Sequence, residues 1–228
     1  MKYKSVKVAK FRKRPNRFIA HVIVDNKEEI VHVKNTGRCM EILREGTVVI
    51  LEEAKNAKRK TKYSIIAGYK GDVLINIDSQ IPNMVVYHGI KKGEIKEFRD
   101  VTKLSKEIVY GNSRFDLYFE TKEQRGFIEV KGVTLETKGI AMFPDAPTQR
   151  GTKHIHEIIK AVEEGYAGFL FFLIQMRGVT HFTPYETRDP EFAKALKLAS
   201  EKGVTILAYD SIVSENEITI GTPVEVRF

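Results

Sequence analysis

The stretch SRFDLYFETKEQRGFIEVKG, residues 113–132, says the most about the architecture of this chain. Two apolar segments flank a polar, turn-like segment from Glu120 to Arg125. We therefore predict a β-hairpin with Asp116 on its first strand and Glu129-x-Lys131 on its second. Successive side chains of a strand alternate between its faces, so Glu129 and Lys131 project from the same face. If the pairing turns Asp116 to that face, two carboxylates and an ammonium group converge.

Such a convergence of Asp116, Glu129 and Lys131 suits a divalent metal and an activated water. Mg²⁺ prefers oxygen ligands and keeps several waters, so two carboxylates and the carbonyl of Val130 would be enough protein ligands. The metal would lower the pKa of a bound water and neutralise charge on a phosphate. Lys131 could orient that water or stabilise developing negative charge.

The alternative for Glu129 and Lys131 is an ordinary solvent-facing pair, because cross-strand charges contribute only about 0.2–1 kcal/mol. Two observations favour the metal site. The residues around the pair are apolar, including Phe127 and Ile128. The helix predicted next begins with side chains that suit an anionic ligand, namely Arg150, Lys153, His154 and His156. Because the two histidines are two residues apart on a helix, they do not share a face, and a paired zinc site is not expected.

Length and composition favour a soluble globular protein of one large or two small domains, with 228 residues, 42% apolar and 30% charged. The longest apolar run, Ala167 to Ile174, is far shorter than the roughly 20 residues that span a bilayer. The segment Met1 to Lys7 has no apolar core of a signal sequence. A single cysteine, Cys39, excludes a disulfide framework and a cysteine-based zinc site. We expect a cytoplasmic protein without membrane association.

Positive charge is concentrated in the first third of the chain. Residues 1–80 contain 18 Lys and Arg against 9 Asp and Glu, whereas the remaining residues contain 20 against 21. A localised basic field points to nucleic acid or another polyanion. The alternative is that these charges only solvate a small β-domain.

Residues 1–80 predict an OB-like basic domain that binds nucleic acid. Turn residues separate five β-runs: Val6–Phe11, Arg17–Val24, Glu29–Val33, Val48–Leu51 and Lys62–Tyr69. A short helix is expected over Gly37–Leu43, with Thr36 as its N-cap. Five strands with a helix before the fourth are typical of a small OB-like barrel, although a fold alone does not assign a function.

Residues 81–228 predict a second domain of the mixed α/β class, giving an α+β chain overall. After a strand at Asp72–Ile77, Asp78 or Ser79 would cap a helix that has Pro82 in its first turn and extends to Ile90. The segment Glu94–Lys106 is expected to be loop-rich. The expected strands and helices then follow in the order Lys106–Tyr110, Arg114–Phe119, Phe127–Val133, helix Thr152–Glu164, Ala167–Ile174, helix Pro190–Ser200 and a closing strand Val204–Tyr209. The continuous apolar run at Ala167–Ile174 predicts a central strand covered on both faces.

Two basic runs of the first domain are candidate DNA contacts. The first contains Arg12, Lys13 and Arg14, and the second contains Lys58, Arg59, Lys60 and Lys62. Arg150 and Lys153 at the start of the second-domain helix are further candidates. Phe11, Phe18 or Tyr63 could stack on bases. The alternative is solvated turns with core aromatics.

Several segments together resemble the sugar fermentation stimulation protein family, SfsA, and the similarity extends over nearly the whole chain. They are Asn112–Asp116, Ile128–Leu135, Phe143–His154, His32–Arg38 and Lys58–Thr61. The resemblance implies an N-terminal OB-like domain, a C-terminal domain similar to PD-(D/E)xK nucleases, DNA binding, and a link to sugar-utilisation genes. In nucleases of that superfamily the two acids bind Mg²⁺ and the lysine assists catalysis, roles that would fall on Asp116, Glu129 and Lys131. One departure is that Asp116 follows Phe115 rather than proline.

The leading hypothesis is thus a DNA-binding protein with a phosphodiester-hydrolysing site that uses Mg²⁺ or Mn²⁺. The alternative is a non-catalytic DNA-binding transcriptional regulator on a nuclease scaffold, and RNA as the ligand is a third possibility. A homodimer is compatible with the sequence. Asp145 is expected either as an outer-sphere metal ligand or as a loop cap, and Gln175 either near the metal site or in a surface hydrogen bond.

Overall fold

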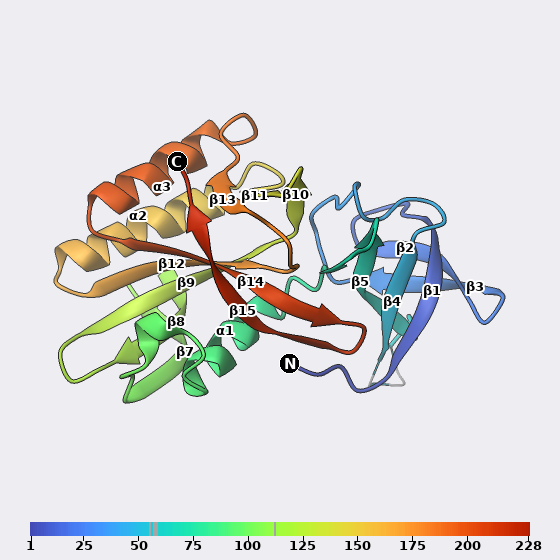
Figure 1. Cartoon of the computed structure of the whole chain (residues 1–228), viewed down its shortest axis with the longest axis horizontal. Helices are drawn as coiled ribbons and strands as arrows, with labels where there is room; N and C mark the ends of the chain where they lie inside the picture. The colour runs from blue at the N-terminus through green and yellow to red at the C-terminus, as the bar shows by residue number, and fades with distance from the viewer. Residues whose placement is uncertain (55, 57–58, 112) are drawn as a thin grey trace.

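The described residues of the chain fold into two β-sheets with three α-helices (Figure 1). The structure is a computed structural model that describes residues 1–54, 56, 59–111 and 113–228. The described strands form a six-stranded sheet at the N-terminal end and a nine-stranded sheet in the rest of the chain. The predicted fold class, an OB-like barrel followed by a mixed α/β domain, is confirmed. No helix in the described part of the chain is long and apolar enough to cross a membrane.

The N-terminal sheet closes into a barrel because β3 pairs with both β2 and β5. Its strands are β1 (Val6–Lys13), β2 (Ile19–Val24), β3 (Lys27–Val33), β4 (Val48–Glu53) and β5 (Tyr63–Lys70), with β6 (Val73–Asn76) added beside β5. Asp25 and Asn26 both have positive φ, which the two-residue turn between β2 and β3 requires. All five predicted barrel strands are therefore present.

The predicted helix over Gly37–Leu43 is wrong. This segment forms a single turn in which the amides of Ile42 and Leu43 both donate to the carbonyl of Cys39. Cys39 itself has φ of 47°, which ends any regular helix. The carbonyls that a helix would need are also occupied, because the Arg14 guanidinium binds those of Gly37 and Arg38.

The second sheet has the order β10-β11-β13-β15-β14-β12-β9-β8-β7. Its strands are β7 (Lys103–Tyr110), β8 (Ser113–Glu120), β9 (Arg125–Val133), β10 (Leu135–Thr137), β11 (Ile140–Phe143), β12 (Ala167–Ile174), β13 (His181–Pro184), β14 (Thr205–Ser214) and β15 (Glu217–Val226). Helices α2 (Gln149–Glu163) and α3 (Pro190–Glu201) cover one face, and α1 (Pro82–Lys91) covers the other (Figure 1). As predicted, β12 is a buried central strand, which pairs in parallel with β9 and β14.

Several predicted boundaries in this domain are wrong. Val204–Tyr209 is not the closing strand, because β14 continues to Ser214 and β15 follows it. The helix α2 begins at Gln149, where Thr148 caps it by accepting from the amide of Gly151, rather than at Thr152. The strands β10, β11 and β13 were not predicted, and the loop expected over Glu94–Lys106 contains a 3₁₀ turn at Lys96–Phe98 and the first residues of β7.

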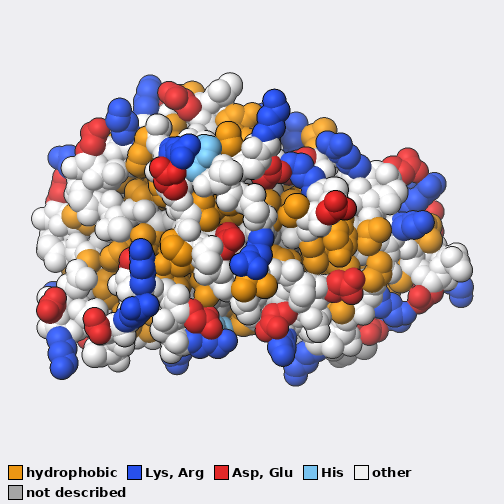
Figure 2. All heavy atoms as spheres, viewed as in Figure 1, with side chains coloured by type: hydrophobic (Ala, Val, Ile, Leu, Met, Phe, Trp, Pro, Cys, Tyr) orange, Lys and Arg blue, Asp and Glu red, His pale blue; other side chains and the backbone are white. Residues whose placement is uncertain are grey.

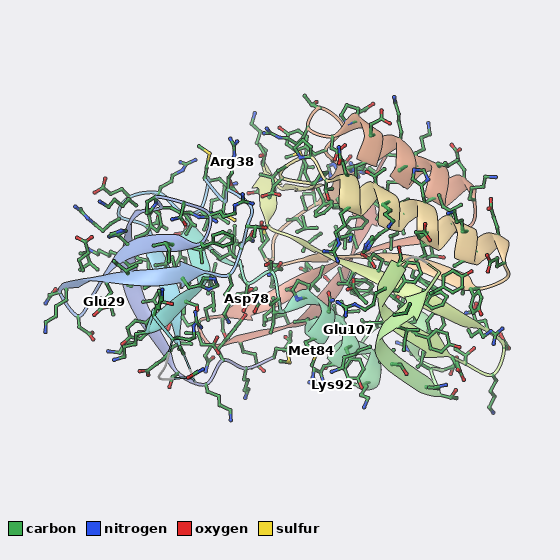
Figure 3. The ribbon with its side chains drawn as sticks, turned by 180° about the vertical axis from the view of Figure 1, so that it is seen from behind. Glu29, Arg38, Asp78, Met84, Lys92 and Glu107 are labelled. Atoms are coloured by element: carbon green, nitrogen blue, oxygen red, sulfur yellow. The ribbon has the colours of Figure 1, made fainter. Side chains whose placement is uncertain are left out.

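The helix α1 begins at Pro82 after Ile81, so neither Asp78 nor Ser79 is its cap. Asp78 instead belongs to a buried polar cluster at the boundary between the barrel and the second sheet (Figure 3). We call this set the junction cluster: Tyr3, Lys34, Glu52, Asn76, Asp78 and Gln175. The Lys34 ammonium lies 2.7 Å from Glu52 and 2.9 Å from Asp78. These bonds join the two parts of the chain through side chains far apart in sequence.

Candidate metal and phosphodiester site

The predicted hairpin is formed by β8 and β9, which pair antiparallel with Leu117 opposite Ile128. Asp116 lies immediately before Leu117, just outside this ladder of pairs. Its Oδ2 accepts the backbone N–H of Val130 at 2.8 Å, and its Oδ1 accepts from the side-chain amide of Asn83 in α1 at 2.6 Å. The carboxylate of Asp116 is thereby fixed between a sheet strand and the start of a helix.

Glu129 is buried, with 2% of its surface exposed. Its Oε1 accepts two bonds of 2.5 Å, one from Nζ of Lys131 and one from Nδ1 of His154 in α2. Its Oε2 is also buried, and it has no hydrogen-bond partner among the described residues. As predicted, Glu129 and Lys131 lie on one face of β9. We call Asn83, Asp116, Glu129, Lys131 and His154 the metal-site cluster.

The negative charge of Glu129 affects the pKa of Asp116. Burial and the charge of Glu129 raise the pKa of Asp116 to about 6, against the bonds from Val130 and Asn83 and the charge of Lys131. Burial also raises the pKa of Glu129, but His154 and Lys131 outweigh it, so this pKa lies below its ordinary value. One carboxylate is thus held ionised beside a second whose charge is disfavoured, which is the condition that a bound cation relieves.

The donor set fits a cation that keeps part of its water shell. Within the described residues, no group of three or more His, Cys, Asp and Glu side chains is arranged as a complete metal centre. The fit instead rests on Asp116 and on the unpartnered Oε2 of Glu129. Mg²⁺ is commonly bound by one or two carboxylates together with waters and substrate phosphate. Glu129 and Asp116 meet that requirement.

Sequence reasoning assigned His154 to an anionic ligand and not to Glu129, and it missed Asn83 altogether. His154 had a detectable signal: it lies four residues before Ile158 and seven before Ala161, on the buried stripe of α2. His156, in contrast, is exposed. Asn83 had no such signal, because its contact with Asp116 joins residues 33 apart in sequence.

Among the described residues, no hydrogen bond joins Asp145 or Gln175 to the metal-site cluster, although Gln175 lies against Gly132, the residue after Lys131. A Cβ on Gly37 would come within 2.2 Å of Oδ2 of Asp145, so that carboxylate faces the barrel loop. The side chain of Gln175 is buried and donates to Oδ1 of Asn76 and the carbonyl of Asp78, rather than making a surface hydrogen bond. Both residues line a cavity of about 160 Å³ between the barrel loop and the end of β9.

The first basic run lies at the end of β1, on the rim of a hollow of about 490 Å³. Arg12 is exposed and lies 2.8 Å from Glu45, and Lys13 is exposed. The guanidinium of Arg14 donates to four carbonyls, those of Asn35, Gly37, Arg38 and Arg17. Arg14 therefore holds the barrel loop in shape, and its Nη donors are directed at the protein.

The second basic run precedes β5. Lys58 lies outside the described residues. Arg59 and Lys60 are exposed, and Arg59 donates to the hydroxyls of Thr61 and Ser64. Lys62 is 3.6 Å from Glu53. Both basic runs contact the end of β3. Ser64, which accepts from Arg59, pairs with His32 of that strand, and Arg14 of the first run donates to the carbonyl of Asn35 just beyond it.

The remaining predicted contacts divide into exposed and buried residues. Arg150 and Lys153 are exposed on the first turns of α2, and neither forms a salt bridge within the described part of the chain. Phe18 is 51% exposed, whereas Phe11 and Tyr63 are core residues with 2% and 3% exposed. Of the three aromatic residues proposed to stack on bases, only Phe18 is accessible.

Comparison with known proteins finds relatives that are similar over the full length of the chain. Residues 13–77 match the family model described as the SfsA N-terminal OB domain, and residues 80–217 match the sugar fermentation stimulation protein RE domain. A sugar fermentation stimulation protein homolog of Alkaliphilus oremlandii is 53% identical over 233 residues, covering 100% of this chain and 99% of its own. A homolog of the same name from Clostridium botulinum strain Langeland is 52% identical over 98% of both chains.

A solved structure gives the same result at lower identity. The structure of Pyrococcus furiosus SfsA in complex with Ca²⁺ superposes with a TM-score of 0.90 at 28% sequence identity, covering 100% of this chain and 98% of the other. Identity above half over whole chains, two matching domain models and a shared fold lead to one assignment. This chain belongs to the sugar fermentation stimulation protein (SfsA) family.

Proposed function

We propose that this protein binds DNA and carries a phosphodiester-hydrolysing site that uses Mg²⁺ or Mn²⁺. The observation that carries the proposal is Oε2 of Glu129, a buried carboxylate oxygen without a partner among the described residues. Buried polar atoms almost always have a partner, in the protein or in a bound group. A divalent cation held by Glu129 and Asp116 would supply it. The Ca²⁺ named for the Pyrococcus furiosus relative supports a divalent cation as a ligand of this chain.

Each member of the metal-site cluster has a role in this chemistry. Asp116 and Glu129 would hold the cation, which when bound lowers the pKa of a water and neutralises phosphate charge. Lys131 lies beside them with 16% of its side chain exposed, so its ammonium group can also face a phosphate oxygen. Asn83 and the amide of Val130 keep Asp116 in place, and His154 keeps Glu129 in place.

The barrel would contribute most of the affinity for DNA. Its excess of positive charge attracts the phosphate backbone without regard to base sequence. The exposed side chains Lys13 and Lys60 would contact phosphates, and Phe18 would stack on an unpaired base. Arg150 and Lys153 would contact the same strand near the metal site. Control of sugar-utilisation genes, suggested by the family name, would then act through DNA.

The test is cleavage of labelled linear, branched and single-stranded DNA with Mg²⁺ or Mn²⁺, together with calorimetric titration of Mn²⁺. We expect Glu129→Gln to abolish both cleavage and high-affinity Mn²⁺ binding. Glu123→Gln, which changes an exposed acid in the β8–β9 turn, is the matched control and should leave both unchanged. If the wild-type protein neither cleaves any of these substrates nor binds Mn²⁺, the enzymatic proposal is wrong.

A second candidate is a DNA-binding regulator that keeps the nuclease scaffold without turnover. One observation favours it: the ammonium of Lys131 is 2.5 Å from Glu129, so it is directed at a carboxylate instead of a substrate. In this case Asp116→Ala should leave DNA affinity unchanged or increase it, because a negative charge is removed. Loss of all function only after substitution of barrel cations, with Glu129→Gln without effect, would distinguish this candidate from the first.

A further inference from the structure

A second group of cations lies beside the metal-site cluster, in the part of the chain whose overall charge is slightly negative. The helix α1 places Asn83, Tyr87 and Lys91 four residues apart, so the three side chains follow one stripe of the helix. Asn83 begins that stripe at its hydrogen bond to Asp116. The stripe thus leads directly away from the candidate metal site.

Two ammonium groups converge on the ring of Tyr87. Nζ of Lys91 lies 5.2 Å from the ring centroid, and Nζ of Lys106 in β7 lies 5.0 Å from it. Lys106 also reaches Sδ of Met84 at 3.7 Å, and it pairs in the sheet with Leu117, the residue after Asp116. The aromatic face attracts both cations and holds them at defined positions on otherwise flexible side chains.

No carboxylate neutralises this pair. Neither Lys91 nor Lys106 forms a salt bridge with any residue that the structure describes. Glu107, the residue after Lys106 in β7, lies 3.6 Å from Arg114 instead. Figure 3 shows Glu107 in the same region as Met84 of α1 and Lys92 just after this helix, and Figure 2 shows Lys and Arg side chains, with Asp and Glu side chains between them, along the lower edge of the molecule near this helix. Two like charges held at one ring, without a counter-charge, are suited to an anion.

His88 lies beside these lysines on α1. Burial lowers the pKa of His88 most, and the charges of the N-terminal amine, Lys92, Lys106 and Lys91 lower it further. Lys92 lies 3.7 Å from Glu94, so Lys91 and Lys106 are the two lysines of the group without a salt bridge to any described residue.

We propose that Tyr87, Lys91 and Lys106 form a phosphate clamp that holds a DNA strand next to the site of Asp116 and Glu129. The clamp rests on the proposed function, because it would hold phosphates adjacent to the one bound at the metal-site cluster. One helical turn, about 6 Å, separates Asn83 from Tyr87. One or two nucleotides span that distance, at about 3.4 Å of rise per strand. The clamp would therefore fix the direction in which the strand leaves the site.

The clamp is tested by the salt dependence of DNA binding, measured by fluorescence anisotropy in EDTA so that the DNA stays intact. The double variant Lys91→Gln/Lys106→Gln removes two phosphate contacts. We expect the slope of log Kobs against log salt to fall in magnitude by about 1.8 on duplex and about 1.4 on single-stranded DNA. The matched control is Lys122→Gln/Lys197→Gln, which changes two exposed, unpaired lysines of a turn and of α3, and it should keep the wild-type slope.

A second pair of variants tests the ring. Tyr87→Phe keeps the aromatic face and should bind DNA as the wild type does, whereas Tyr87→Leu should weaken binding by a few-fold because the ammonium groups lose their anchor. Melting temperatures within about 2 °C of wild type would show that the lysine variants are folded. A wild-type slope in the folded Lys91/Lys106 variant would overturn the clamp alone. Absence of any salt-dependent binding by the wild type would overturn DNA binding itself, and the clamp with it.

Discussion

The junction cluster and the metal-site cluster both bury carboxylates beside cations, but they use their hydrogen-bonding capacity differently. In the junction cluster, the Asp78 carboxylate accepts hydrogen bonds from the Lys34 ammonium, the Tyr3 hydroxyl and the backbone amide of Gln80. Asn76 binds Tyr3 and accepts from Gln175. None of the buried side-chain atoms in this cluster lacks a partner among the described residues. In the metal-site cluster, one carboxylate oxygen of Glu129 does.

The difference also appears in charge. Burial lowers the pKa of Lys34, but Asp78 and Glu52 outweigh that effect, so its pKa is raised and its charge is stabilised. At the metal-site cluster the opposite holds for Asp116, whose pKa is raised by burial and by Glu129. A buried network in which every polar atom has a partner contributes to stability and order. A network with an unpartnered polar atom costs stability until a ligand supplies the missing partner. The junction cluster thus has the properties expected of a structural network, and the metal-site cluster has those expected of a site that a ligand would complete.

The largest effect is expected at the junction cluster, where every buried polar side-chain atom has a partner among the described residues. Asp78→Ala would leave the buried Lys34 with only Glu52 and would remove a partner from Tyr3, so it should destabilise the protein by about 3 kcal/mol. Urea denaturation followed by circular dichroism measures the change. The exposed Asp72 provides the control, and Asp72→Ala should change stability by less than about 0.5 kcal/mol. Equal, small effects of both substitutions would remove the distinction between the two clusters.

A substitution in the metal-site cluster should change stability in the opposite direction. Asp116→Asn removes the disfavoured charge and keeps an amide that can bond to Val130 and Asn83, so we expect the metal-free protein to gain about 2 kcal/mol at neutral pH. Because the folded pKa of about 6 lies above the ordinary 3.8, Asp116 contributes its stability at low pH and loses it as pH rises through 6. The advantage of the variant should therefore be absent below about pH 4 and complete above about pH 7.

Denaturation in EDTA across this pH range tests the prediction. Asp100→Asn, at an exposed acid, should show no such dependence. If Asp116→Asn destabilises the metal-free protein at pH 7, then Asp116 is a structural residue and the comparison with Asp78 fails.

Local sequence pattern was sufficient to place Asp116 and Glu129 on two paired strands and insufficient for the contacts that surround them. The strands were predictable because two short apolar segments flank a polar turn, and alternation along β9 fixes that Glu129 and Lys131 share a face. The run at Ala167–Ile174 was predictable because eight consecutive apolar residues can only be buried. His154 and Asn83 reach the carboxylates from two different helices, and only the packing of α1 and α2 on opposite faces of the sheet brings them there.

The strand β15 was also not predicted, because local sequence does not reveal contacts with another strand. Gly221 and Pro223 lie within it, and both normally argue against a strand. The structure accommodates them at a bulge opposite Tyr209 to Ser211, where the carboxylate of Asp210 accepts the amide of Thr222 at 2.6 Å. A side chain on another strand thus supplies the bond that the ladder lacks, and the sequence of β15 alone contains no sign of it.

The smallest effect separates two roles for His154. Its Nδ1 and the ammonium of Lys131 both occupy Oε1 of Glu129, which leaves Oε2 as the oxygen available to a cation. If His154 positions the carboxylate, then His154→Phe should weaken Mn²⁺ binding about tenfold, or about 1.4 kcal/mol, as loss of such supporting bonds does at other metal sites. His154→Asn retains a donor near Nδ1 and should restore most of the affinity. A role in packing alone predicts the reverse order, because Phe fills the buried space of His154 better than Asn does. Calorimetric titration of the two variants with Mn²⁺ decides between them, with His156→Asn on the exposed face of α2 as the control.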